Sequence, residues 1–164
     1  MNLNEYYEIV KQFDRTPKGR ELDHFVYGVA SEILEFKLAE TKHNQDEEIG
    51  DKVWFCMMYA KWRGIDIYEY DLNKEFDTYY ELLEEILSCA KRVSVFGKDK
   101  YFERLDYAML YQLRMLIEYG PTELERLCKM NIEKLSNRSE NNGLENPENR
   151  DFVAETKILK AENE

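Results

Sequence analysis

The chain has 164 residues, enough for one domain with a hydrophobic core, and 43% of them are apolar or aromatic although 35% are charged. Acidic residues outnumber basic ones by 34 to 23, which gives a formal net charge of −11. Nucleic acids and anionic membrane surfaces are bound by clustered lysine and arginine, so neither is an expected partner. An acidic ligand is compatible with this charge only if divalent cations lie between it and the protein.

The cysteines and the N-terminal sequence indicate the compartment. Cys56, Cys89 and Cys128 are widely separated and show neither zinc-site spacing nor the density of a disulfide framework, so reduced thiols are expected. No basic segment followed by an apolar one marks a secretory signal, and no stretch has the length of a membrane span. A cytoplasmic protein is therefore expected.

The balance of residue types favours helices. The chain has only 3 prolines and 7 glycines, and helix formers such as Glu, Leu and Lys dominate. We expect an all-α fold with a four-helix-bundle core, additional helical segments and a polar C-terminal tail. One domain would cover residues 1–138, and the partly flexible tail would cover 139–164. Apolar residues at helical spacing predict helices over 3–13, 21–42, 47–63, 72–95, 101–119 and 122–138.

Turn and capping residues set the expected helix ends. The polar segment 43–46 predicts a break in which Asn44 or Asp46 caps the next helix, and Gly64 is expected to end that helix. Thr122 and Glu125 have the spacing of a capping box. In the tail, the apolar residues could dock on the core or on a second subunit. They are Phe152, Val153, Ile158 and Leu159.

Two pairs of acids stand out, Glu32 with Glu35 and Glu48 with Asp51. Each pair has the spacing i, i+3, which places both carboxylates on one side of a helix, one turn apart. Two helices joined by a short turn pack antiparallel, so the second pair can lie opposite the first. Four converging carboxylates would form a site for a hard divalent cation. Each pair alone is typical of a solvated helix face in an acidic chain.

The acidic pairs and their surroundings resemble a known family. The chain has a sequence similar to the ExxE…ExxD signature of MazG-like nucleoside triphosphate pyrophosphohydrolases: Glu32-Ile33-Leu34-Glu35, twelve intervening residues and Glu48-Ile49-Gly50-Asp51. These enzymes belong to an all-α superfamily that includes dimeric dUTPases. The stretch 47–54 is similar to the family's EELGDVLW segment, and 131–138 resembles its NxxKLxxR segment. The match covers about 22–64 and 129–138, and residues 72–119 match only in being helical.

The resemblance implies an enzyme that hydrolyses a nucleoside triphosphate to the monophosphate and pyrophosphate. Glu32, Glu35, Glu48 and Asp51 would be the catalytic acids and would ligate Mg²⁺, with Mn²⁺ as a possible substitute. The family also implies a homodimer or homotetramer. The resemblance leaves open which glutamate is the general base, the preferred base and sugar, and the number of metal ions.

The remaining site residues have alternative explanations. The resemblance implies that Asn131, Lys134 and Arg138 bind substrate, but the family often continues into a Tyr-Pro turn where this chain has Ser139-Glu140. A solvated last helical turn whose basic residues complement the helix dipole would explain them equally well. His24 precedes Gly28 on the acidic side of its helix and is a further candidate for substrate binding, or a polar edge position without a functional role. For the whole chain, the alternative function is a non-catalytic helical interaction protein that retains the fold.

Overall fold

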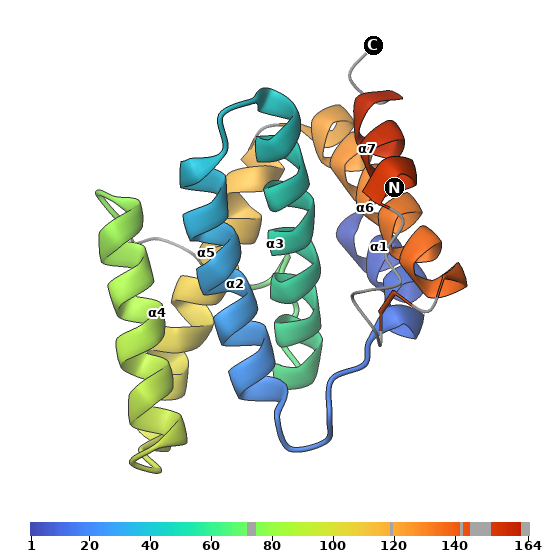
Figure 1. Ribbon diagram of the computed structural model, residues 1–164. Helices are drawn as coiled ribbons and strands as arrows, with labels where there is room; N and C mark the ends of the chain where they lie inside the picture. Colours follow the sequence, from blue (N-terminus) through green and yellow to red (C-terminus); the bar gives the residue numbers. More distant parts are fainter. Residues whose placement is uncertain (72–74, 119, 142, 145–151, 162–164) are drawn as a thin grey trace.

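The computed structural model describes residues 1–71, 75–118, 120–141, 143–144 and 152–161. The described residues form helices and no strand, which confirms the expected all-α fold (Figure 1). In the described part of the chain, seven α-helices and two short 3₁₀ helices follow one another: α1 Leu3–Val10, η1 Lys11–Phe13, α2 Glu21–Leu38, α3 Lys42–Arg63, α4 Tyr79–Ser94, η2 Asp99–Tyr101, α5 Phe102–Glu118, α6 Pro121–Glu140 and α7 Phe152–Ala161.

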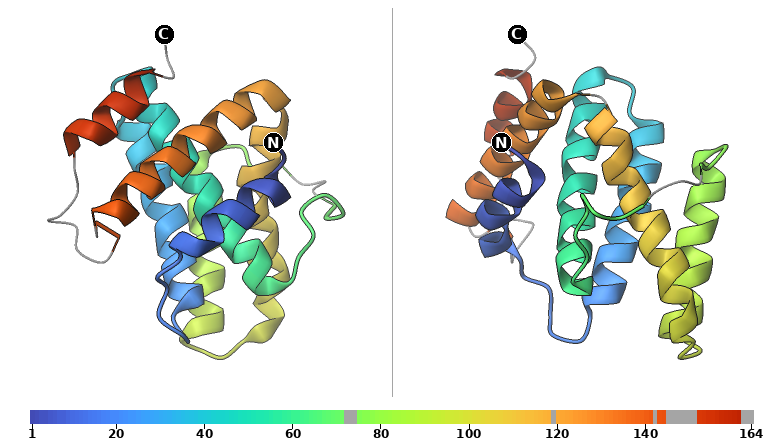
Figure 2. Two further views of the ribbon diagram at one scale, coloured as in Figure 1. Left: turned by 90° about the vertical axis from the view of Figure 1, so that its right-hand side faces the viewer. Right: turned by 180° about the vertical axis from the view of Figure 1, so that it is seen from behind.

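The long helix α3 is the centre of the fold. It packs antiparallel beside α2, and α4 and α5 complete a ring in which α2 contacts α4, α4 contacts α5 and α5 contacts α3. Helices α1, α6 and α7 contact α3 on another side, where α6 crosses it (Figure 2). The narrower expectation of a four-helix-bundle core stays a prediction. This arrangement leaves the first half of α3 between α2 on one side and α6 with α7 on the other.

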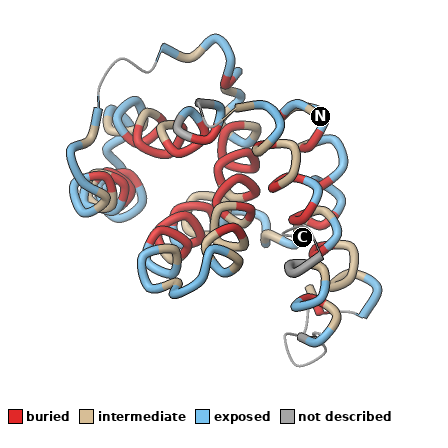
Figure 3. Tube along the Cα trace, turned by 90° about the horizontal axis from the view of Figure 1, so that it is seen from above, coloured by how far each residue is buried: buried red, intermediate tan, exposed pale blue. Residues whose placement is uncertain are grey.

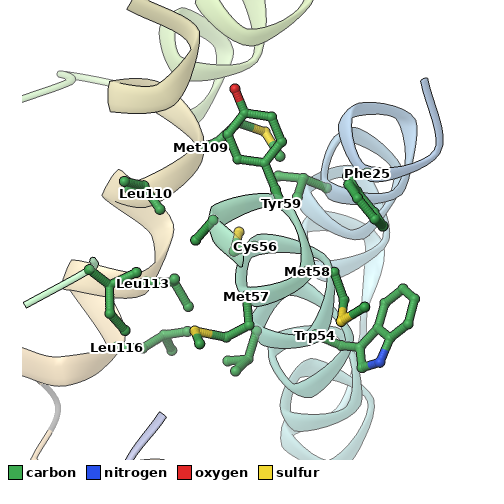
Figure 4. Packing of buried hydrophobic residues seen from close by; sticks show 14 of the residues in the cluster. Phe25, Trp54, Cys56, Met57, Met58, Tyr59, Met109, Leu110, Leu113 and Leu116 are labelled. Carbon is green, nitrogen blue, oxygen red and sulfur yellow. The ribbon is translucent and has the colours of Figure 1, made fainter. Parts of the chain in front are cut away.

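The core follows the apolar faces of these helices. Buried residues line the inner sides of the helices, and exposed residues occupy their outer sides (Figure 3). Cys56, Met57 and Tyr59 lie between α3 and α5, whereas Phe25 and Met58 lie on the side of α2 (Figure 4). The three cysteines are free and buried, as expected, and burial raises the pKa of the Cys56 thiol to about 12.

The turn between α2 and α3 lies earlier than the polar segment 43–46 predicts. Helix α2 ends at Leu38, and α3 begins at Lys42 with Thr41 as its N-cap. The prediction that Asn44 or Asp46 caps the helix is wrong, because the Thr41 hydroxyl accepts the hydrogen bond from the Asn44 backbone N–H at 3.2 Å. Gly64 ends α3 in the left-handed conformation, with φ of 69°, as predicted.

Two other helix starts also differ from the prediction. Helix α4 begins only at Tyr79, because Thr78 is extended and caps it; residues 72–74 of the predicted 72–95 helix lie outside the described residues. Helix α6 begins at Pro121 with Gly120 as its N-cap and no side-chain cap, so the predicted capping box of Thr122 and Glu125 is wrong. Pro121 has the backbone φ of a first helical turn without needing a hydrogen bond from its nitrogen.

Part of the predicted polar tail is a helix. Helix α7 packs against α6 and α3, so this segment contacts the core of its own chain. The side chains of Phe152 and Leu159 lie outside the described residues, but Glu155 is buried and binds Arg138 of α6. Among the described residues, no helix combines the length and the apolar character that crossing a bilayer requires.

Candidate functional site

Three carboxylates meet between α2 and α3. Glu32 on α2 and Glu48 and Asp51 on α3 each offer an oxygen, and these oxygens lie within 4.8 Å of one another. The antiparallel packing of the two helices produces this convergence, as the spacing of the two acidic pairs predicts. Glu35 does not belong to this group. It is exposed and lies on the wall of the same pocket.

The three carboxylates are close enough to disturb one another's ionisation. Burial raises the pKa of Glu32 well above its usual value, and the charges of Asp51 and Glu48 raise it further. The pKa of Glu48 is also raised, chiefly by burial. The Oε2 atom of Glu32 is buried and has no hydrogen-bond partner among the described residues. An unpartnered carboxylate oxygen beside two other acids is the electrostatic environment that a cation stabilises.

Asp51 is held by two side chains from α6. Asn131 donates its amide N–H to Asp51 Oδ1 at 2.7 Å, and the Lys134 ammonium donates to Asp51 Oδ2 at 2.5 Å. Lys134 also donates to Glu47 at 3.1 Å. Burial alone lowers the pKa of Lys134, but Asp51 and Glu47 outweigh it, so the pKa is raised and Lys134 is a cation. Asn131 and Lys134 are 2% and 1% exposed, which rules out the solvated-turn explanation for them.

Tyr6, which belongs to no recognisable sequence motif, completes this chain of contacts. Tyr6 of α1 is fully buried, and its hydroxyl donates to Asn131 Oδ1 at 2.6 Å. Gly50 allows α6 to come this close, since a Cβ atom there would lie 3.3 Å from the Asn131 Cβ. Tyr6 therefore fixes the orientation of the Asn131 amide, and the amide fixes one oxygen of Asp51.

We expect the substitution Tyr6→Phe to lower the free energy of unfolding by about 1 to 3 kcal/mol, because Asn131 Oδ1 then lacks its buried donor. Urea unfolding in the presence of EDTA measures the difference. Tyr7→Phe is the matched control, since Tyr7 is half-buried on the same helix and lies outside this chain of hydrogen bonds. Equal stabilities of the two variants would show that the Tyr6 hydroxyl does not support the site.

Arg138 lies at the pocket wall but is engaged by the tail helix. Its Nε and Nη2 atoms donate to the two carboxylate oxygens of Glu155 on α7 at 3.0 and 2.9 Å. Such a bidentate pair is among the stronger hydrogen-bonded arrangements in proteins. Glu155 itself is 4% exposed. No sequence pattern marks Glu155 as this partner, because it is one acid among many in a polar segment.

His24 lies at another part of the same pocket. Its Nδ1 atom lies 2.6 Å from the oxygen of the Thr16 hydroxyl, whose one hydrogen is donated to Asp14 Oδ1. Burial lowers the pKa of His24, and Asp14 only partly opposes this, so the ring is neutral at pH 7. A neutral imidazole can accept or donate a hydrogen bond to a ligand without adding charge.

The acids form one wall of a cavity of about 680 Å³. Aromatic side chains line it as well, among them Trp54, Phe55 and Phe13. No space is left beside Gly28, because a Cβ atom there would lie 2.3 Å from the Phe55 ring. Glycine thus lets Phe55 pack against α2 at the edge of the cavity. The volume lies within the range of small-molecule sites.

The site therefore brings together two kinds of residue. Glu32, Glu48 and Asp51 converge, and Glu35, His24 and Arg138 line the same pocket. Asn131 and Lys134 lie behind Asp51 and act on it directly. Comparisons of the chain with models of known families, with curated proteins and with solved structures found no match.

Proposed function

We propose that the protein is a Mg²⁺-dependent nucleoside triphosphate pyrophosphohydrolase, which cleaves an NTP or dNTP to the monophosphate and pyrophosphate. The observation that carries this proposal is the convergence of Glu32, Glu48 and Asp51 within 4.8 Å beside a cavity of about 680 Å³. The resemblance of 22–64 and 129–138 to MazG-like enzymes supports the same activity.

The donor set fits magnesium. All three converging groups are carboxylates, and Mg²⁺ prefers oxygen ligands. The buried Oε2 of Glu32, which has no hydrogen-bond partner in the described part of the chain, would gain one from a bound cation. Zinc would be expected to recruit histidine or cysteine, and the cysteines are buried in the core. Mn²⁺ takes similar oxygen ligands and is the expected substitute. Bound Mg²⁺ would neutralise triphosphate charge and stabilise the pyrophosphate leaving group.

The chain's own residues then have distinct roles in the proposal. Glu32, Glu48 and Asp51 bind the cation, while Lys134 and Asn131 keep Asp51 oriented. Glu35 lies on the pocket wall and stays exposed, which suits a carboxylate that orients the attacking water. Arg138 and His24 are the candidates for contacting substrate oxygens, and Trp54 and Phe55 offer apolar surface to the base.

A second copy of the chain is part of the proposal. Large apolar side chains are exposed on α2 and at the C-terminal end of α4, including Tyr27 at 63% and Val95, the C-cap of α4, at 67%. Tyr27, Leu87 and Val95 line one groove between these two helices. An exposed apolar groove of this kind supports the homodimer or homotetramer that the resemblance implies.

Cation binding is expected to release a proton. Because the pKa of Glu32 is raised by burial and by neighbouring acids, Glu32 is protonated at pH 7 without a cation, and Mg²⁺ displaces this proton. The apparent affinity for Mg²⁺ therefore rises with pH up to the raised pKa. Calorimetry in buffers of different ionisation enthalpy measures the release, for which we expect up to about one proton per cation. Glu32→Gln carries no such proton, and unchanged release by this variant would contradict the assignment.

The test of the proposed activity is the identity of the products. Incubation of the protein and Mg²⁺ with a panel of NTPs and dNTPs should release pyrophosphate and the monophosphate from at least one of them. Release of orthophosphate and a diphosphate would place the cleavage at the wrong bond and contradict the proposal. If the folded protein cleaves none of them, the non-catalytic interaction protein becomes the better explanation.

A further inference from the structure

A second cavity lies within the ring of α2, α3, α4 and α5. It measures about 140 Å³ and shares no lining residue with the acidic pocket. Its lining comes from all four helices and from the segment before α4, and consists of Phe36, Ile49, Lys52, Phe76, Asp77, Thr78, Tyr79, Leu82, Tyr111, Gln112 and Leu116. Neither the expected metal site nor the proposed hydrolysis uses these residues.

Lys52 is an unusual residue for such a cavity. It is 4% exposed, and its ammonium makes no hydrogen bond or ion pair with any residue that the structure describes. Its close contact is the Phe36 ring, whose centroid lies 4.3 Å from Nζ. Glu32 and Glu48 attract the ammonium from the side of the acidic pocket without forming an ion pair with it. The side chain is largely buried and its ammonium has no hydrogen-bonded partner among the described residues, so an anion in the cavity would stabilise it.

The beginning of α4 provides a second attraction for an anion. Thr78 caps this helix of 16 residues, and both Thr78 and Tyr79 line the cavity. The N-terminus of a helix carries a partial positive charge and backbone N–H donors. The Lys37 ammonium lies 4.0 Å from the centroid of the Tyr79 ring and adds positive charge nearby. Lys52 on α3 and the N-terminus of α4 thus both favour a negatively charged ligand.

The other lining residues indicate the size and polarity of the uncharged part of the ligand. Leu82 and Leu116 are buried, and the Phe76 and Tyr111 rings meet edge to face at 5.0 Å between centroids. Gln112 is 5% exposed and makes no hydrogen bond among the described residues, so its amide offers a further polar contact. A cavity of about 150 Å³ admits a single benzene ring. Asp77 lies at the exposed side and disfavours a ligand with several negative charges.

We propose that this cavity binds a small aromatic monocarboxylate, with its ring among Leu82, Leu116 and Tyr111 and its carboxylate on Lys52. A single negative charge is enough to neutralise the Lys52 ammonium, and the volume limits the ligand to a single ring. Phosphate esters fit less well, because they carry more charge than the cavity can neutralise and because most of its lining is apolar.

Benzoate is the probe, titrated calorimetrically into the full chain without nucleotide or Mg²⁺, so that the result is independent of the proposed hydrolysis. We expect saturable binding that weakens by at least about 10-fold for benzamide, which has the same shape and no charge. Lys52→Met should weaken benzoate binding to a similar extent, and Lys91→Met, which replaces an exposed lysine of α4, should leave it unchanged.

A measurement on the wild-type protein covers the case in which Lys52→Met does not fold. Nuclear Overhauser contacts from the benzoate ring protons should reach the methyl groups of Leu82 and Leu116, which line the cavity. The proposal is overturned if benzoate does not bind at up to about 20 mM. It is equally overturned if benzamide or Lys52→Met binds as tightly, or if the contacts fall on other residues.

Discussion

Replacing Glu48 with glutamine is expected to lower the rate of pyrophosphate release by about 1000-fold or more, the scale on which single preorganised charged groups act in active sites. Glu48 offers one of the three converging oxygens, and glutamine keeps its shape while removing its charge. The loss should appear in kcat as well as in kcat/KM, because the carboxylate acts on charge that develops during the reaction.

The fold should survive this substitution, which separates a catalytic loss from unfolding. Burial and the neighbouring acids raise the pKa of Glu48, so the neutral amide relieves repulsion in the absence of a cation. In EDTA, the variant should therefore be at least as stable as the wild type. Glu84→Gln is the matched control, since Glu84 is an exposed glutamate of α4 away from the pocket. Activity of the Glu48 variant equal to that of this control would remove Glu48 from the proposed machinery.

The substitution Lys134→Met should have the largest effect on stability. Lys134 is 1% exposed and binds both Asp51 and Glu47. Its removal leaves two acids without their cation in a partly buried place beside Glu32 and Glu48. Breaking a buried ion pair from one side costs about 3 to 5 kcal/mol. Urea unfolding in EDTA measures this loss.

Two further variants identify the cause of the stability loss in Lys134→Met. Adding Asp51→Asn to Lys134→Met removes the uncompensated charge, so the double variant should be more stable than the Lys134 variant alone. Lys129→Met removes an exposed lysine of the same helix and should change the stability by less than about 0.5 kcal/mol. If Lys134→Met lowers the free energy of unfolding no more than Lys129→Met does, the ion pairs of Lys134 do not hold α6 against α3.

The sequence predicted the helices better than their ends. Apolar residues at helical spacing mark α2, α3 and α5, because this periodicity directly reflects which face is buried. The start of α3 was misplaced because Thr41, Asn44 and Asp46 are all good capping residues, and the choice depends on tertiary contacts. Asp46 is buried within α3, where it pairs with Arg126 of α6 at 2.7 Å. A contact between residues 80 positions apart cannot be recognised from the local sequence around either of them.

The site was predictable in the part that depends on spacing. The pairs on α2 and α3 predict convergence because a short turn makes the helices antiparallel, and three of the four acids do converge. The supporting residues Tyr6 and Glu155 could not be predicted from the sequence, since neither belongs to a distinguishing motif. Their functions come from partners on α6, Asn131 and Arg138. Residues that act through a long-range contact are found only once the packing is known.

The most direct test of the account is the thermal unfolding of the wild type and of Glu48→Gln with increasing Mg²⁺. A cation bound by Glu32, Glu48 and Asp51 stabilises only the folded chain. At ten times the dissociation constant, the unfolding midpoint of the wild type should rise by about 3 to 6 °C, and it should keep rising with the logarithm of the Mg²⁺ concentration. The variant should show little of this rise. A wild-type midpoint that does not respond to Mg²⁺, or an equal response of the variant, would contradict the assignment of these acids as a cation site.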